Sequence, residues 1–226
     1  MNRLETVILP ARASKIENLA FMGCSMLNSV VLPPYLKKIG MGAFANCINL
    51  KSIDFPATLT SIGGYDQQRS YGESGTASFV NTGIEKFDFS KCSFSYNTGI
   101  DKSWTYVFAD CNNLKEVRLP KGISNIEVRF YPNTVVACFV PSSVKRLKIH
   151  NVKEIHFTSP EPPEILEGIS GCTIYVPKGC MTKYYAKFNG NANTIKEEST
   201  ENSSRSSFYY VELLKKITIW HYSESQ

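Results

Sequence analysis

The seven cysteines and three histidines are the residues that would matter most to an enzyme. A Cys–His pair gives a nucleophilic thiolate only where a base lies beside an activated thiol. The sequence brings neither His150 nor His156 to any one cysteine in particular, and no C-x-x-C pair indicates a zinc or thioredoxin motif. We therefore expect no catalytic residues, no metal site and no cofactor. A cysteine-dependent enzyme, with a thiol of lowered pKa, is the alternative.

Three of the cysteines share one position of a sequence repeat, which favours a structural role. Cys24, Cys47 and Cys111 each follow a phenylalanine by three residues. A small apolar residue that recurs with the period of a fold fills the same buried slot in each unit. A redox or metal-binding ladder is the alternative for this column. Cys172 and Cys180 could also form a disulfide in an exported protein.

These positions depend on a repeat that organises the first half of the chain. Residues 4–10 (LETVILP), 27–33 (LNSVVLP) and 50–56 (LKSIDFP) recur with a step of 23 residues. Alternate side chains of such a segment face the same side, which predicts a short strand that ends at the proline. The A-F-x-x-C segment that follows has helical spacing and predicts a short helix or 3-10 turn.

The repeat resumes after two insertions. Residues 84–89 (IEKFDF) and 114–120 (LKEVRLP) give further copies, whereas residues 63–77 and 93–103 have the Gly/Ser/Tyr-rich composition of surface loops. Residues 126–139 fit no copy. Since one unit cannot bury its own apolar face, successive units must stack, and the repeat predicts a solenoid with parallel strands.

The repeating unit resembles the BspA-type leucine-rich repeat of bacterial surface proteins. The residues that carry the resemblance are Leu27, Val30, Leu32, Pro33, Ile39, Ala43, Phe44, Cys47 and Leu50, with their counterparts in other copies. It covers residues 4–125 closely and residues 140–195 more loosely, where 140–149 and 152–157 give strand-like copies. The resemblance implies an α/β solenoid of about five to seven coils. We expect a curved parallel sheet, short helices or 3-10 turns, irregular insertions and a C-terminal cap.

The domain organisation follows from the extent of the repeat. One leucine-rich-repeat domain covers residues 1–195, with degenerate repeats and the cap at about 140–195. Residues 196–207 (KEESTENSSRSS) are a polar linker by composition, and residues 208–226 are an apolar segment of unassigned role. Because the chain begins inside a repeat, we expect further sequence upstream of Leu4, which could hold an export signal.

The outward-facing side chains of the expected strands form the first candidate interaction face. Equivalent positions on stacked parallel strands become neighbours. One expected column reads Ser52, Lys86, Glu116, Arg146 and Glu154, and the other reads Asp54, Asp88, Arg118, Lys148 and His156. Signs alternate along the first column. This face is either a recognition surface or a solvated face with weak ion pairs.

Aromatic residues of the insertions form a second set of candidate contacts. They are Tyr65, Tyr71, Tyr96, Trp104 and Tyr106. Protein interfaces favour Tyr and Trp, and loops on a rigid scaffold often carry binding residues. The same loops could instead fold back over the solenoid, or their rings could act as stacking platforms for a glycan.

Composition argues against two classes of protein. The net charge of +5 is spread along the chain without a Lys/Arg run, so we expect no nucleic-acid partner. No segment approaches the roughly 18 uninterrupted apolar residues of a membrane span. Residues 1–10 also lack the basic start, the apolar stretch and the cleavage site of a signal peptide.

We therefore expect a non-catalytic macromolecular binding module whose partner is a protein or a glycan, with the oligomeric state left open. The resemblance implies a bacterial protein at the cell surface or in the secreted fraction, with a role in adhesion to host, matrix or microbial surface proteins. The alternative is a carbohydrate-binding accessory protein that uses the aromatic insertions.

Overall fold

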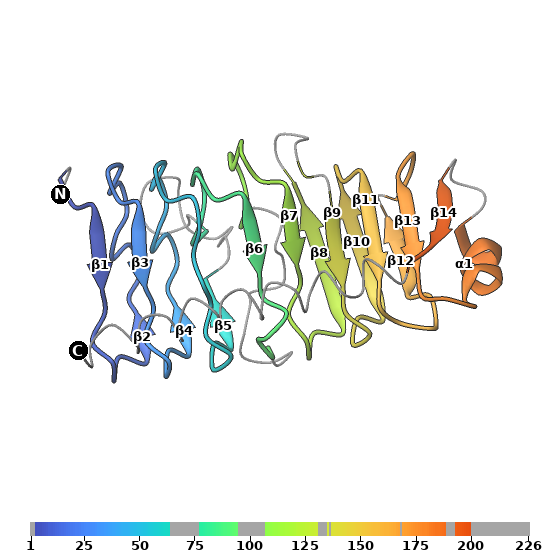
Figure 1. Cartoon of the computed structure of the whole chain (residues 1–226), viewed down its shortest axis with the longest axis horizontal. Coiled ribbons are helices and arrows are strands. Elements are labelled where there is room, and N and C mark those ends of the chain that lie inside the picture. Colours follow the sequence, from blue (N-terminus) through green and yellow to red (C-terminus); the bar gives the residue numbers. More distant parts are fainter. Residues whose placement is uncertain are drawn as a thin grey trace, which may run out of the picture.

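The computed structural model describes residues 3–63, 77–94, 107–130, 135, 137–167, 169–188 and 193–199. These residues form a parallel β-solenoid of about seven coils. The strands stand side by side along the long axis of the molecule, from β1 at one end to β14 and the helix α1 at the other (Figure 1). The solenoid fold expected from the repeat is therefore confirmed.

The first strand of each coil builds the main sheet. Six strands pair in the order β6, β7, β9, β11, β13, β14, and β1 pairs with β3 at the N-terminal end. Their bounds are β1 Thr6–Ile8, β3 Ser29–Val31, β6 Lys86–Asp88, β7 Glu116–Arg118, β9 Ala137–Val140, β11 Glu154–Phe157, β13 Thr173–Val176 and β14 Thr194–Glu197. Residues 51–56 keep the alternation of exposed and buried side chains without forming a strand, and Glu85 N donates to Lys51 O across to the next coil.

A second set of strands, which we call the second track, follows the main sheet around each coil. It contains two parallel groups, β2 (Lys15–Ile16) with β4 (Lys38–Ile39) and β5 (Ser61–Ile62), and β8 (Asn125–Arg129) with β10 (Arg146–His150) and β12 (Glu164–Glu167). Each group buries an apolar side chain 12 residues after the first position of its coil, as at Ile16, Ile126 and Leu147. Residues 126–139, which fit no copy of the repeat, thus supply most of β8 and the start of β9.

The A-F-x-x-C segments form hydrogen-bonded turns rather than a regular helix. In the first coil, the N–H groups of Met22 and Cys24 donate to carbonyls three residues earlier, which is the bond of a 3-10 turn. The N–H of Phe21, which lies between them, donates instead to Ala43 O of the next coil at 2.8 Å. These segments therefore join neighbouring coils as a sheet does. The one α-helix among the described residues is α1 (Met181–Phe188).

This alternation of partners places a left-handed residue at one fixed position of each turn. Gly23, Asn46, Asn81 and Asp110 hold equivalent positions, and their φ angles lie between 53° and 74°. Glycine, asparagine and aspartate adopt this conformation at the lowest cost. Asn81 Nδ2 also donates to Asn46 Oδ1 at 2.9 Å, so the side chains bond from coil to coil.

The core is one continuous row of stacked apolar side chains. The ring centroids of Phe21 and Phe44 lie 5.4 Å apart, and those of Phe44 and Phe79 lie 5.6 Å apart. Cys24, Cys47 and Cys111 are buried beside this row, as the repeat predicts. Each coil therefore buries its apolar side chains against the preceding one, which is why a single unit would not be stable alone.

The helix α1 closes the C-terminal end of this core. Tyr184 and Phe188 are buried, and their rings lie 5.3 Å and 6.2 Å from that of Phe157. The Tyr184 hydroxyl donates to Ser159 O at 2.8 Å, which satisfies the polar end of a buried side chain. Beyond α1, β14 pairs with β13 and includes residues 196 and 197, the first two of the range that composition suggests as a linker.

Candidate interaction surface

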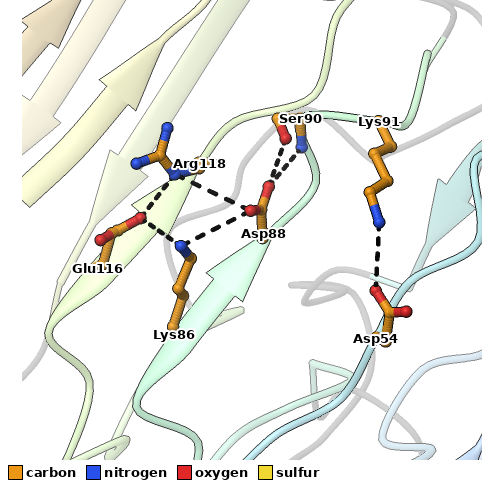
Figure 2. Close-up of polar contacts among 7 residues, drawn as sticks. All are labelled: Asp54, Lys86, Asp88, Ser90, Lys91, Glu116 and Arg118. Atoms are coloured by element: carbon orange, nitrogen blue, oxygen red, sulfur yellow. Dashed lines mark hydrogen bonds and ion pairs between the residues drawn. The ribbon is translucent and has the colours of Figure 1, made fainter. Parts of the chain in front are cut away.

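Four charged side chains form a closed network on the outward face of β6 and β7. The strand register sets Lys86 opposite Glu116 and Asp88 opposite Arg118. Glu116 Oε1 accepts from Arg118 Nε at 2.6 Å and lies 2.9 Å from Lys86 Nζ. Asp88 Oδ2 lies 3.7 Å from Lys86 Nζ and 3.9 Å from Arg118 Nε, so each charge faces two opposite charges (Figure 2).

Two further contacts hold this network at its edge. Asp88 Oδ1 accepts hydrogen bonds from Ser90 N at 3.0 Å and from Ser90 Oγ at 2.5 Å, which fixes the carboxylate in place. Asp54 lies one coil earlier, with 89% of its side chain exposed, and its Oδ1 atom is 3.8 Å from Lys91 Nζ (Figure 2). Asp54 is thus the most accessible carboxylate beside the network.

The network offers fixed geometry and little net charge. Its side chains are between 24% and 45% exposed, so water screens each pair and each contributes less than about 1 kcal/mol to folding. The two positive and two negative groups cancel. A partner would therefore be selected by the arrangement of donors and acceptors, and the attraction of unlike net charges would contribute little.

A stacked column of side chains continues the same face towards the C-terminal end. It consists of Arg118, Phe139, His156, Tyr175 and Lys196, which the register aligns on successive strands. The Arg118 guanidinium lies 3.8 Å from the Phe139 ring centre. The His156 ring then stacks between Phe139 at 4.2 Å and Tyr175 at 4.4 Å, and Lys196 Nζ lies 5.9 Å from the Tyr175 ring centre.

Two carboxylates flank the imidazole at the centre of this stacked column. His156 Nδ1 lies 2.5 Å from Glu198 Oε1, and Nε2 lies 3.6 Å from Glu154 Oε2. His156 is only 7% exposed, because rings cover both of its faces and carboxylates lie at both nitrogens. Its environment is that of a residue that holds strands together, and the more exposed edges of Phe139 and Tyr175 are left to meet a partner.

The sequence-based columns are wrong at Arg146 and Lys148. Both residues lie on β10 of the second track, where Arg146 Nε is 3.1 Å from Glu164 Oε2 and Lys148 Nζ is 3.5 Å from Glu127 Oε1. The strand that follows Arg118 on the main sheet is β9, which places Phe139 next to Arg118. The spacing of 12 residues between Val135 and Leu147, the same as between Leu114 and Ile126, was the signal that could have found this register.

The expected positions of the other face residues are observed. Glu154 and His156 lie on β11 beside β9, one strand further from Glu116 and Arg118 than the sequence suggests. The aromatic residues of the insertions (Tyr65, Tyr71, Tyr96, Trp104 and Tyr106) lie outside the described residues. The charged network and the stacked column therefore define the main-sheet surface, by which we mean these two groups of side chains together with Asp54.

The environment of the cysteines is apolar. All seven thiols are free, and all except Cys180 are buried. Burial raises the pKa of the Cys47 and Cys92 thiols to about 12 and that of Cys172 to about 11, and it also raises the pKa of Cys111 and Cys138. Because a thiolate is the reactive form, these five groups are poor nucleophiles at neutral pH.

Cys47 Sγ donates to Phe21 O at 3.2 Å and Cys111 Sγ donates to Phe79 O at 3.1 Å, so both thiols bond to the preceding coil. In the fourth coil Thr82 holds the cysteine position, and its hydroxyl lies 3.4 Å from Cys111 Sγ. These contacts give the cysteine column a packing role. Within the described part of the chain, no group of three or more His, Cys, Asp or Glu side chains is arranged to hold a metal ion. None of the described helices has the length and apolarity needed to cross a membrane.

Comparison with known proteins places the repeat in a family. A family described as "BspA type Leucine rich repeat region (6 copies)" matches residues 1–71 and 68–156. No curated protein matches the chain. Among solved structures, the pneumococcal vaccine antigen PcpA is similar at 18% identity and a TM-score of 0.49, covering 87% of this chain and 42% of that one. A leucine-rich repeat protein from Bacteroides ovatus is similar at 16% identity and a TM-score of 0.38, covering 87% and 61%. The chain thus spans less than two thirds of either structure.

Proposed function

The chain belongs to the BspA-type leucine-rich-repeat family, and on that premise we propose that it is a non-catalytic module that binds another protein, at the cell surface or in the secreted fraction. The family is one of surface protein-interaction repeats. The polypeptide partner is a host, matrix or microbial surface protein that contacts the main-sheet surface. An adhesive role follows if that partner is held on another cell or on a matrix.

The observation that carries this proposal is the rigidity of the main-sheet surface. Its donors and acceptors are already fixed by one another, since Glu116 contacts both Lys86 and Arg118, and Asp88 contacts Ser90. A partner that binds such a surface does not have to order its side chains, and this reduces the entropic cost of association. Partly exposed aromatic rings beside the network supply the apolar contact area that protein interfaces favour.

The first test is binding of the labelled chain to an array of matrix proteins, microbial surface proteins and glycans. A Lys86→Glu, Arg118→Glu variant changes the main-sheet surface. The matched control is Arg146→Glu, Lys148→Glu, which makes the same change of charge on β10 of the second track. We expect a protein hit that the first variant loses and the control retains.

Other outcomes of this array would contradict the proposal. Loss in both variants would mean that net charge, and not this surface, controls binding. A hit that both variants retain would place the binding surface elsewhere, and glycan hits without protein hits would favour the carbohydrate-binding alternative. Circular dichroism of each variant would establish that the solenoid is still folded.

A further inference from the structure

A second surface lies on a different side of the solenoid, at the turns that lead into β2 and β4. We propose that this surface binds a short acidic segment of a partner polypeptide. It consists of Arg12, Lys15, Tyr35, Lys37 and Lys38, which we call the basic corner. All five side chains are exposed, and they come from two successive coils. The basic corner shares no residue with the main-sheet surface, so its test is independent of the function proposed above.

Charge at the basic corner is unbalanced. The register of β2 and β4 sets Lys15 directly opposite Lys38, and like charges opposite each other destabilise a sheet. Glu17 lies 2.6 Å from Lys15 and compensates that one lysine. Among the residues that the structure describes, no carboxylate forms an ion pair with Arg12, Lys37 or Lys38. A bound anion would relieve this repulsion, whereas the network on the main sheet is already neutral.

Tyr35 gives the basic corner an anchor on a rigid turn. Its side chain is 63% exposed and follows two consecutive prolines. Leu36 N donates to Pro33 O at 3.1 Å, and Thr58 Oγ1 of the next coil lies 2.7 Å from Pro34 O and 2.9 Å from Leu36 O. The turn is therefore held from both sides. Tyrosine and arginine are the residues that most often anchor protein interfaces, and Arg12 holds the position equivalent to Tyr35 in the preceding coil.

The extent of the basic corner favours a short peptide over a long anionic polymer. In the third coil the equivalent positions are Thr58, Thr60 and Ser61, which are neutral, and the Thr60 hydroxyl donates to Lys37 O at 3.2 Å. The cations thus occupy two coils, which are about 5 Å apart. A sulfated polysaccharide gains affinity from cations repeated along its length, and here the row of cations ends after the second coil. A few carboxylates of an extended peptide would be enough to meet it.

The test uses the full chain and a fluorescein-labelled poly-glutamate peptide of about eight residues, which spans about 25 Å when extended. Binding is measured by fluorescence anisotropy at low and at raised salt. We expect Lys37→Glu, Lys38→Glu to weaken binding at least about tenfold and Tyr35→Ala to weaken it about threefold. Lys153→Glu, Lys187→Glu, which changes two exposed lysines elsewhere by the same charge, is the matched control and is expected to bind as the unaltered chain does.

Three results would overturn the proposal. The unaltered chain would show no binding, or the control would lose as much affinity as the corner variant. Alternatively, a heparin oligosaccharide would bind more tightly than the peptide and lose that binding in the corner variant, which would assign the surface to a sulfated glycan. The Lys86→Glu, Arg118→Glu variant separates the two proposals, because it is expected to retain peptide binding while it loses the partner of the main-sheet surface.

Discussion

The carboxylate of Glu198 reaches the imidazole of His156 across an intervening strand, with 2.5 Å between Oε1 and Nδ1. His156 lies on β11 and Glu198 follows β14, while β13 lies between them and presents Tyr175 to the His156 ring. Three strands are therefore linked through side chains as well as through the backbone. This link closes the C-terminal part of the face, where the A-F-x-x-C turns are absent from the sequence.

Replacement of His156 tests the contribution of this link to stability. We expect His156→Ala to lower the free energy of unfolding by about 2 kcal/mol, since two ring contacts and a hydrogen bond are lost. His156→Phe keeps the ring contacts and loses only the polar ones, so its effect is expected to be smaller. Urea denaturation followed by circular dichroism measures both values. Equal losses for the two variants would show that the stacking contributes nothing.

The charged network predicts a weak, salt-dependent coupling. In a double-mutant cycle of Lys86→Ala and Glu116→Ala, the coupling energy is expected to be below about 1 kcal/mol at low salt. It should fall further in 1 M salt, where screening acts within about 3 Å. The pair is partly exposed, which is the reason for the small value. A coupling above about 2 kcal/mol that salt leaves unchanged would mean that the pair is effectively desolvated.

The left-handed column predicts an unusual order of substitutions at Asn81, whose φ is 53°. Asn81→Ala puts a β-carbon in a conformation that costs an alanine about 1–2 kcal/mol, and it also removes the hydrogen bond to Asn46. Asn81→Gly removes the hydrogen bond alone and is expected to cost less. Thermal unfolding of the two variants measures the difference. A lower melting temperature for the glycine variant would contradict the left-handed assignment.

The buried thiols predict a loss of stability at alkaline pH. Burial raises the pKa of Cys47 and of Cys92 from 9.0 to about 12. Between these values the unfolded chain releases protons that the folded chain retains, so the stabilising contribution is complete below pH 9 and is lost as the pH rises towards 12. Urea denaturation from pH 8 to pH 11 measures the slope. A Cys47→Ala, Cys92→Ala variant should show a smaller slope, and an unchanged slope would assign the effect to other groups.

The repeat alone determined the solenoid and its buried columns. A step of 23 residues between Leu4, Leu27 and Leu50 fixes which side chains must share a core, because only stacking buries so small a unit. The pairing of Lys86 with Glu116 and of Asp88 with Arg118 follows from the same spacing, and the structure has both pairs in register.

The tertiary structure decided what lies beyond Arg118. Residues 135–140 carry no leucine at the first repeat position and no complete motif, so composition did not mark them as a strand of the main sheet. Pairing of Val117 with Cys138 places β9 there, moves Arg146 and Lys148 to the second track and brings Phe139 onto His156. Where a repeat degenerates, alternation still favours a strand, but the choice between two tracks rests on which apolar side chains fill the core left by the preceding coil.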